Sequence, residues 1–394
     1  MIVFYLALII VPPLLPAPPE GAAVLGSFVR FSQFVIWSVW WPFVVLSMLA
    51  FGRGWCGIMC PEGALAAYAS QHGWNRAVPS WMRWGCIPLV AFAGITVLGQ
   101  LIEVDEKPVS QLLVLGGSTL VAVMVALIYR RNTWVWCRYL CPVSLLFGVF
   151  SRLGTMHFRV DHARLQAWRG GGEEAHIKEP CPVQIHLPAL STNRSCLMCF
   201  RCVGWRDSIH LQFRAPGEEL LRINQADPLF WEVIFLFAGA IGLPLGVFHA
   251  EVRELEGAKL VVLLIGSIAV FGAALAGVTW LSARLVFPAR RGACTTAELF
   301  ARIGYLYAPL ALFSLFLGLS IPTFEHLAGV GFPPVARDVI RACLLAAGVL
   351  WSAWLARRII GLQTAHRGKA AAAFSVHVVG IGATLAAWIP VLFR

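Results

Sequence analysis

Long apolar stretches dominate this chain and restrict what it can fold into. A helix needs about 20 mostly apolar residues to cross the roughly 30 Å hydrocarbon core of a bilayer. Such stretches occur near residues 2–17, 31–51, 84–102, 111–129, 230–249, 259–281, 303–322, 339–356 and 372–392. Charged residues make up 13% of the chain, whereas soluble domains carry about 25%. The sequence therefore predicts an all-α, polytopic membrane protein with about nine transmembrane helices.

The first stretch is interrupted by Pro12, Pro13 and Pro16. A cleaved signal peptide would carry a basic region before its apolar core and small residues at a cleavage site. Met1 is followed by no basic region, and no clear cleavage site is present. We therefore expect a helix here rather than a signal segment.

The net charge of +11 is explained by membrane topology, and we expect no nucleic-acid partner. Lys and Arg collect in the cytoplasmic loops of membrane proteins. Basic residues follow every second apolar stretch: Arg53, Arg76 and Arg83, then Arg130, Arg131, Arg138 and Arg152, then Arg284, Arg290 and Arg291, and finally Arg357, Arg358, Arg367 and Lys369. The loops between them are acidic or mixed. This alternation predicts a multi-pass protein of the bacterial inner (cytoplasmic) membrane, with its N-terminus in the cytoplasm and its C-terminus outside.

A long polar segment separates two hydrophobic parts of the chain. We expect residues 1–153 to form an N-terminal transmembrane unit, residues 154–228 a cytoplasmic insert, and residues 229–394 a C-terminal unit of five transmembrane helices. The insert is too short to build a large hydrophobic core and would need a staple such as a bound metal. Four organised cysteines in the insert are candidates to hold that metal.

Eight of the 11 cysteines occur in organised groups. The insert contains Cys181 followed directly by Pro182, and a C-x2-C-x2-C run formed by Cys196, Cys199 and Cys202. Two C-x3-C-P loops contain the other four, which are Cys56, Cys60, Cys137 and Cys141. Free Cys packs as a small hydrophobic residue. We therefore expect ordinary buried thiols at the three cysteines that stand alone, Cys86, Cys294 and Cys343.

The grouped cysteines indicate metal binding or redox chemistry rather than disulfides, because the cytoplasm keeps thiols reduced. A four-thiolate zinc site usually uses two separated C-x2-C pairs. Here three cysteines follow one another at an even spacing of three, which lets their thiolates bind three corners of one iron–sulfur cube while a distant Cys-Pro supplies the fourth ligand. We predict one [4Fe–4S] cluster held by Cys181, Cys196, Cys199 and Cys202, with zinc and free thiols as the alternatives.

The two loops resemble those of a known family. Residues 51–65 read FGRGWCGIMCPEGAL, and residues 136–142 read WCRYLCP. Both are similar to the paired C-x3-C-P loops of the NosR/NapH-type membrane polyferredoxins, and the resemblance extends over residues 30–215, about half of the chain. It implies that each loop follows a transmembrane helix on the cytoplasmic face. It also implies a ferredoxin-like insert and electron transfer between the quinone pool, or a cytoplasmic donor, and a partner redox protein.

The insert departs from the pattern of that family. Members typically carry two ferredoxin motifs, but the residues ahead of Cys181, WRGGGEEAHIKE, contain no cysteine. In two-cluster ferredoxins the Cys of Cys-Pro binds the other cluster, so the resemblance assigns Cys181 to the same cluster as the C-x2-C-x2-C run. We therefore expect one cluster rather than two. The resemblance offers no counterpart for the chain from Asp227 onward.

The C-x3-C-P cysteines permit several interpretations. Cysteines four apart lie about one turn apart on one helical face, so two such pairs at neighbouring helix ends can bring four thiols together. They would then form a second metal centre, a dithiol relay or a transient copper site, since soft thiolates suit Cu(I). The alternative is that they are structural thiols at the helix boundary. Haem is not expected, because His249, His326 and His377 do not fall at matched depths on helices known to be neighbours.

Together these features predict an electron-transfer component of an oxidoreductase system rather than a stand-alone enzyme. Its expected partners are membrane lipid, quinone or quinol, and other redox proteins. Arg194, Arg201 and Arg206 would lower the cost of the cluster's negative charge and attract an acidic partner, unless they reflect only the positive bias of the cytoplasmic side.

Two other functions are weighed against electron transfer. The alternative function is an assembly factor that reduces copper or hands it over to a respiratory metalloenzyme. A permease built on the five C-terminal helices is disfavoured, because those spans contain few ionisable residues, with Glu232 and His377 as the exceptions.

Overall fold

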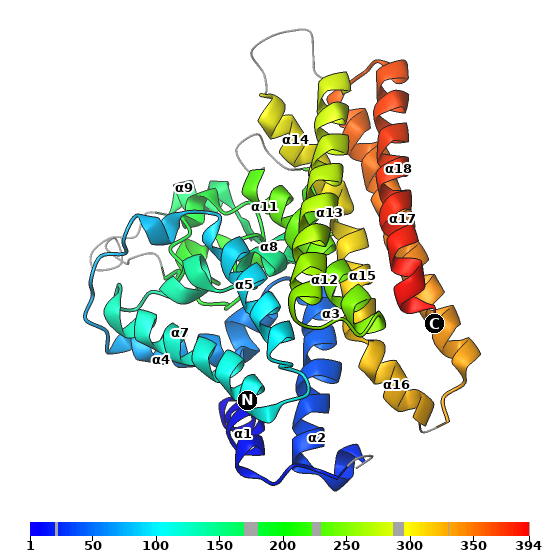
Figure 1. Cartoon of the computed structure of the whole chain (residues 1–394). Helices are drawn as coiled ribbons and strands as arrows, with labels where there is room; N and C mark the ends of the chain where they lie inside the picture. The colour runs from blue at the N-terminus through cyan, green and yellow to red at the C-terminus, as the bar shows by residue number, and fades with distance from the viewer. Residues whose placement is uncertain (20–22, 169–179, 223–229, 287–294, 330, 394) are drawn as a thin grey trace. The chain divides into compact units, whose positions relative to one another are not determined.

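The structure, a computed structural model, describes residues 1–19, 23–168, 180–222, 230–286, 295–329 and 331–393. Helices make up most of these residues (Figure 1). Seven helical segments in the described ranges are long and apolar enough to cross a membrane: Phe28–Phe51, Pro108–Ile128, Phe230–Val252, Gly257–Val286, Thr296–Leu319, Pro334–Gln363 and Arg367–Leu392. The prediction of an all-α polytopic membrane protein is confirmed. Cys294, Arg290, Arg291 and most of the residues just ahead of Cys181 lie outside the described residues.

The other two predicted spans are shorter than expected. The apolar segments Ile2–Leu14 and Ile87–Leu101 coincide with the first and third stretches. In the first, helix α1 (Ile2–Ile10) gives way to a 3₁₀ turn, η1 (Pro12–Leu14), because prolines lack the amide hydrogens that continue an α-helix. In the third, α5 (Ile87–Leu101) begins only after the extended residue Trp84. Helices thus occur at all nine predicted places, and seven of them have the length of a membrane span.

Two compact units divide the chain. Unit 1 contains residues 1–11, 47–91 and 112–219, and unit 2 contains residues 12–46, 92–111 and 220–394. The boundaries along the chain include points within α3 (Trp41–Phe51), α5 and α10 (Glu218–Leu221). All eight grouped cysteines belong to unit 1. The predicted division into three consecutive parts stays a prediction.

Unit 1 combines short helices with a two-stranded sheet. Besides α1 its elements are η4 (Trp55–Met59), α4 (Pro61–Gln71), η5 (Trp81–Arg83), η6 (Leu112–Gly116), α7 (Gly117–Ile128), η7 (Trp136–Leu140), α8 (Ser144–Ser151), β1 (Met156–Val160), α9 (His162–Ala167), η9 (Leu187–Ala189), η10 (Trp205–Asp207) and β2 (Ile209–Phe213). Helix α4 packs along α7, and buried alanines such as Ala66 and Ala122 allow their backbones to approach closely. The strands pair antiparallel, with Phe158 opposite Leu211. The sheet therefore joins the two ends of the segment that contains Cys181 and the C-x2-C-x2-C run.

Unit 2 is a bundle of mostly long helices. Its elements are η1, η2 (Val24–Gly26), α2 (Phe28–Gln33), η3 (Phe34–Trp40), α6 (Pro108–Gln111), α11 (Phe230–Phe235), η11 (Leu236–Gly242), α12 (Leu243–Val252), α13 (Gly257–Val286), α14 (Thr296–Gly304), η12 (Tyr305–Tyr307), α15 (Ala308–Leu319), α16 (Ile321–Gly329), α17 (Pro334–Gln363) and α18 (Arg367–Leu392). The most apolar 18 residues of Phe230–Val252 and of Thr296–Leu319 are each 89% buried, whereas those of Gly257–Val286 are 11% buried. The first two therefore form the core of this unit, and α13, α17 and α18 run beside one another around it (Figure 1).

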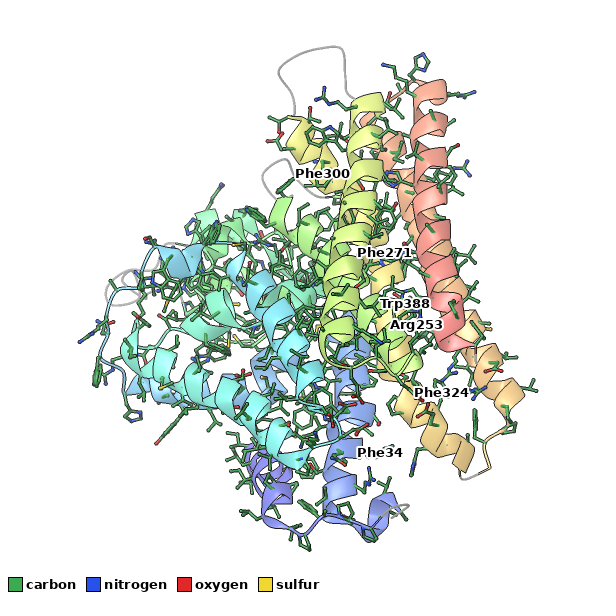
Figure 2. All side chains as sticks on the ribbon, in the orientation of Figure 1. Phe34, Arg253, Phe271, Phe300, Phe324 and Trp388 are labelled. Carbon is green, nitrogen blue, oxygen red and sulfur yellow. The ribbon has the colours of Figure 1, made fainter. Side chains whose placement is uncertain are left out.

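Aromatic side chains fill the core of unit 2. Phe300 of α14, which is labelled in Figure 2, packs against Phe237 with ring centroids 6.2 Å apart. Trp388 of α18 packs against Phe248 of α12 with ring centroids 5.7 Å apart. These large contacts join helices that are far apart in the sequence, and aromatic pairs stabilise packing beyond their buried area.

The ionisable residues predicted in the C-terminal spans have local hydrogen-bond partners. The Tyr305 hydroxyl donates to the carboxylate of buried Glu232. His377 Nδ1 lies 3.1 Å from the Tyr307 hydroxyl, and His249 Nε2 lies 2.9 Å from a backbone carbonyl oxygen of α18. Such bonding lowers the cost of a polar group at membrane depth.

The isolated cysteines differ in their burial. Cys86 is buried, as predicted. Cys343 is exposed, so the prediction of a buried thiol is wrong there. It lies on a face of α17 that points away from the helix bundle. A small hydrophobic side chain suits a lipid-facing surface as well as a protein core, and the residue type alone therefore does not distinguish the two.

Candidate metal centre

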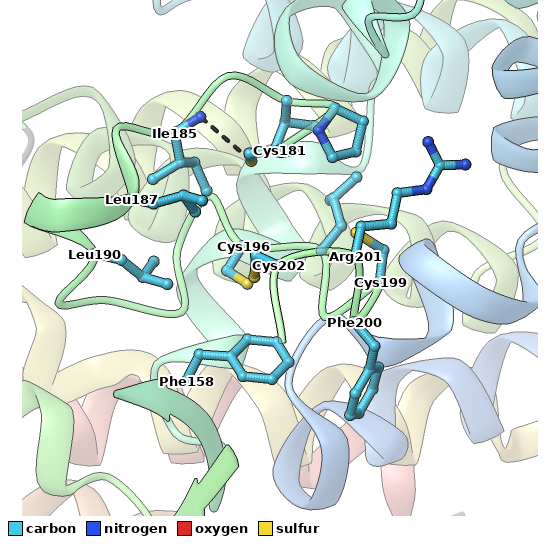
Figure 3. Close-up of a pocket in the computed structure, with 13 residues that line it drawn as sticks. Phe158, Cys181, Ile185, Leu187, Leu190, Cys196, Cys199, Phe200, Arg201 and Cys202 are labelled. Atoms are coloured by element: carbon cyan, nitrogen blue, oxygen red, sulfur yellow. Dashed lines mark hydrogen bonds between the residues drawn. The ribbon is translucent and has the colours of Figure 1, made fainter. Parts of the chain in front are cut away.

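Cys181, Cys196, Cys199 and Cys202 line one cavity of unit 1 (Figure 3). The first comes from the Cys-Pro turn and the others from the C-x2-C-x2-C run, so the structure brings together all four predicted cluster ligands. Of the 13 described residues that line this cavity, Arg201 is the only charged one. The cavity therefore offers four sulfur donors within an otherwise largely apolar wall.

A tight turn follows Cys181. Pro182 comes directly after it, and Gln184 adopts a left-handed φ of +54°. The turn directs the backbone N–H of Ile185 toward Cys181 Sγ, to which it donates a hydrogen bond of 3.4 Å (Figure 3). Hydrogen bonds to sulfur favour its charged form, so the turn is suited to a thiolate ligand.

Left-handed backbone recurs between the cysteines of the C-x2-C-x2-C run. Met198 has a φ of +52° and Phe200 a φ of +61°, values that bulky residues rarely adopt. They flank Cys199, which is not left-handed. Alternating backbone of this kind forms concave N–H sites for anions, including many Fe–S sites. The strained run therefore fits a negatively charged cluster.

Burial dominates the electrostatics of these thiols. It raises the pKa of Cys196 to about 12 and that of Cys202 to about 11, and it also raises the pKa of Cys181. Other cysteines of the cavity add to each rise. As free groups these thiols are protonated at neutral pH. A bound metal reverses this, because it deprotonates a coordinating thiol.

A cluster and a single ion make different geometric demands on the cysteines. In the described part of the chain, no three His, Cys, Asp or Glu side chains converge closely enough to hold one metal ion. The ligands of a [4Fe–4S] cube bind four different irons, so they surround a larger volume than the ligands of one ion. Four cysteines line one cavity, and their role as the ligands of a cluster stays a prediction.

The two C-x3-C-P loops share one backbone conformation. Each contains a π-turn, η4 or η7, that begins at the Trp before its first cysteine. The N–H of Cys60 donates to the carbonyl oxygen of Trp55 at 2.9 Å, and that of Cys141 donates to Trp136 at 3.0 Å. Pro61 then starts α4. Short π-turns inside helical segments are frequent at functional sites, and here the same turn occurs twice.

The four cysteines of these loops form a second group of thiols, the quartet Cys56, Cys60, Cys137 and Cys141. Burial raises the pKa of each thiol, and that of Cys137 reaches about 12. The cysteines lie close enough to raise one another's pKa further at Cys60, Cys137 and Cys141. The loops thus bring four thiols together, of which Cys137 is buried and the other three are half-buried, while their role as metal ligands stays a prediction.

The quartet and the cavity are in contact through Gly57. A Cβ atom at Gly57 would lie 2.2 Å from the carbonyl oxygen of Leu197, 2.8 Å from the backbone nitrogen of Cys199 and 2.9 Å from its Cα. Only a residue without a side chain allows this approach of two backbones. Gly57 was not singled out by its spacing, and its position between the two cysteines of the first loop is the only sequence signal for it.

We expect Gly57→Ala to disturb both cysteine groups, because the added methyl group meets backbone atoms that cannot rotate away. The variant should retain less iron than the unchanged protein when both are purified anaerobically in detergent. Gly63→Ala is the matched control, since a Cβ there meets its nearest atom only at 3.4 Å. Equal iron contents in the two variants would contradict the importance of this contact.

Two acidic residues that the sequence analysis did not predict lie near the cysteine groups. Glu62 accepts a hydrogen bond of 2.7 Å from the Ser118 hydroxyl, and burial raises its pKa to about 7. Glu219 is buried and accepts a hydrogen bond of 3.0 Å from the N–H of Asn193, three residues before Cys196. Acidic residues are common on any membrane-protein loop, so the sequence contained no signal that separates these two from the rest.

The arginines predicted around the cluster differ in their contacts. Arg201 lies over the Trp134 ring, with its guanidinium carbon 4.9 Å from the centroid. Arg206 lies over Trp205 at 4.5 Å. The carbonyl oxygen of Arg194 accepts a hydrogen bond from Arg53. The sequence analysis had named Arg53 only as one of the basic residues of the loops.

The sequence matches a family described as "4Fe-4S binding domain" over residues 33–79 and 112–161. The matched residues include both C-x3-C-P loops and stop before Cys181. The match supports the predicted iron–sulfur cluster. It also draws attention to the quartet, because those cysteines lie in the matched part of the chain.

Two curated relatives are similar to part of the chain. An uncharacterised protein of Methanocaldococcus jannaschii is 25% identical over 182 residues, covering 41% of this chain and 63% of its own length. YccM of Escherichia coli K12, whose name describes it as a candidate electron transport protein, is 26% identical over 189 residues, covering 41% of this chain and 50% of its own length. No solved structure matches this chain. The closer resemblance to the NosR/NapH type stays a prediction, and the chain is an all-α polytopic membrane protein that matches a 4Fe-4S binding domain around its two C-x3-C-P loops.

Proposed function

We propose that this chain is a membrane-bound iron–sulfur protein that transfers electrons one at a time. The observation that carries the proposal is the single cavity lined by Cys181, Cys196, Cys199 and Cys202, with left-handed backbone between the last three. The match to a 4Fe-4S binding domain supports the same chemistry. The similarity to YccM, a candidate electron transport protein, supports electron transfer as its use.

The residues of the cavity would bind and tune a [4Fe–4S] cluster. The four thiolates would each bind one iron, and the bound cluster supplies a one-electron couple. The N–H group of Ile185, which donates to the sulfur of Cys181, would stabilise negative charge on the cluster. The apolar wall around the cysteines would limit the access of water, and both factors set the reduction potential.

The quartet would form a second redox-active site beside the first. Its four thiols are buried or half-buried and lie close together, and they lie in the residues matched to the 4Fe-4S binding domain. The contact of Gly57 with Leu197 and Cys199 would keep the two sites near enough for electron exchange. A thiolate quartet would also accept Cu(I), so the metal content of this site needs to be measured.

The partners and location of the protein follow from its sequence pattern. The alternation of basic and acidic loops supports placement in a bacterial inner membrane with the N-terminus and the cavity on the cytoplasmic side and the C-terminus outside. In that position the protein would exchange electrons with a quinone of the membrane, or with a cytoplasmic donor, and with a partner redox protein. It would act as one component of an oxidoreductase system.

Metal analysis tests this function directly. The full chain is purified anaerobically in detergent, its iron, sulfide, copper and zinc are quantified, and its EPR spectrum is recorded before and after dithionite. We expect about four irons and four sulfides per chain for one cluster, or about eight of each if the quartet also holds one. Reduction should produce an S = 1/2 signal.

Two other results would change the conclusion. Zinc in place of iron, or iron without a reducible signal, would rule out electron transfer by this cavity. Copper that disappears in a Cys56→Ser/Cys60→Ser variant, while the cluster remains reducible, would instead support the copper-handling function.

A further inference from the structure

Arg53 lies between the cavity and the quartet. Its side chain is 5% exposed. Its Nη1 donates a hydrogen bond of 3.0 Å to the carbonyl oxygen of Arg194, two residues before Cys196. It also lies close enough to Cys56 and Cys137 for its charge to lower the pKa of both thiols. One buried cation therefore lies beside both cysteine sites.

The surroundings of Arg53 provide little compensation for its charge. Among the described residues no carboxylate forms an ion pair with it, and its Nε is buried without a hydrogen-bond partner. A buried guanidinium is costly unless negative charge lies nearby. The groups beside it that become negative are the thiolates of the quartet, which do so when they bind metal. The site is therefore built for an anionic group.

Arg53 and Gly57 contact the same segment of the chain. Arg53 lies two residues before the η4 turn, and its bond to Arg194 ties this end of the turn to the segment that continues into Leu197 and Cys199. Gly57, inside the turn, makes the closest backbone approach to the same segment. Two separate contacts therefore hold η4 against the C-x2-C-x2-C run.

We propose that Arg53 is a positioning residue shared by the two cysteine sites, which holds η4 on the Leu197–Cys199 segment and favours the reduced state of the iron–sulfur group bound there. The inference rests on the proposed function. When a one-electron donor reduces that group, the donor loses one electron and the thiolate-bound group gains one negative charge. A buried cation and its N–H groups stabilise that added charge, which raises the reduction potential.

A redox titration of the full chain in detergent, followed by EPR, tests this inference. Arg53→Gln should lower the midpoint potential of at least one iron–sulfur signal, with a roughly tenfold fall in the equilibrium constant for reduction, or about 59 mV for a one-electron couple. Arg53→Lys should shift it in the same direction by less, because an ammonium keeps the charge but lacks the planar fork of donors. The matched control is Arg83→Gln, since Arg83 is an exposed arginine of unit 1 that does not line the cavity, and solvent screens its charge.

The outcomes separate this inference from the proposed function. A wild-type protein with no iron or no reducible signal would overturn the proposed function itself. A reducible wild type, with the same potential in Arg53→Gln as in the unchanged protein or as in Arg83→Gln, would overturn only the role of Arg53. If Arg53→Gln does not accumulate with iron, Arg53→Lys decides, and a wild-type potential in that variant refutes the proposal.

Discussion

Replacing Cys199 with serine is expected to remove the cluster of the cavity, with a loss of about four irons and four sulfides per chain. The thiolate of Cys199 is one of four sulfur donors around that cavity, and a serine hydroxyl is a harder and less acidic ligand that binds iron poorly in its place. The S = 1/2 signal of the reduced cluster should disappear with the iron. Iron and sulfide assays on anaerobically purified protein, together with EPR, measure both losses.

The control for this variant is Cys86→Ser. Cys86 is also a cysteine of unit 1 and is buried, but it does not line the cavity. Its replacement should leave iron, sulfide and the reduced signal unchanged. Full cluster content in Cys199→Ser, or equal losses in the two variants, would show that the cavity is not the cluster site.

Replacing Glu219 with alanine is expected to destabilise unit 1 by about 3–5 kcal/mol, the usual cost of removing one partner of a buried ion pair. Arg152, which is fully buried, lies 3.3 Å from Glu219, and Arg214 pairs with the other carboxylate oxygen. Glu219 also accepts hydrogen bonds from Thr192 and from the N–H of Asn193. Its loss therefore leaves two guanidinium groups without this carboxylate and loosens the segment that leads to the C-x2-C-x2-C run.

Thermal unfolding in detergent measures this effect, and the release of iron on heating shows whether the cluster is lost with it. Glu218→Ala is the neighbouring control. Glu218 accepts a backbone hydrogen bond from Ala215, and a single hydrogen bond of this kind contributes about 0.5–1.5 kcal/mol. If Glu219→Ala unfolds at the same temperature as Glu218→Ala, the buried network does not support the site in the way its contacts indicate.

The membrane fold was predictable because its signal is local. Each span is a continuous apolar stretch, and hydrogen bonding within one helix satisfies its backbone in lipid. The prediction was less accurate where backbone geometry interrupts the pattern, as at the prolines after α1 and at the late start of α5. Hydropathy also does not say which helices face one another, so the sequence did not distinguish the buried segment Phe230–Val252 from the outward-facing α13.

The cysteine groups were predictable for a similar reason. Within each C-x2-C-x2-C or C-x3-C-P motif the cysteines are separated by two or three residues, and that spacing limits the geometry with which they can bind metal. The two loops share a π-turn because they share a short motif. The sequence analysis had predicted that the two cysteines of each loop lie on one face of a helix, and it did not predict the π-turn.

The membrane-spanning helices and the cysteine motifs could be recognised from the sequence alone. The contacts of Gly57 with Leu197 and Cys199, and of Arg53 with the carbonyl oxygen of Arg194, could be found only in the folded chain. These partners are about 140 residues apart in the chain. The spacing of residues within one segment does not predict its contact with the other, because the two segments meet only after the helices of unit 1 have packed together. That packing is what turns two separate cysteine motifs into adjacent sites.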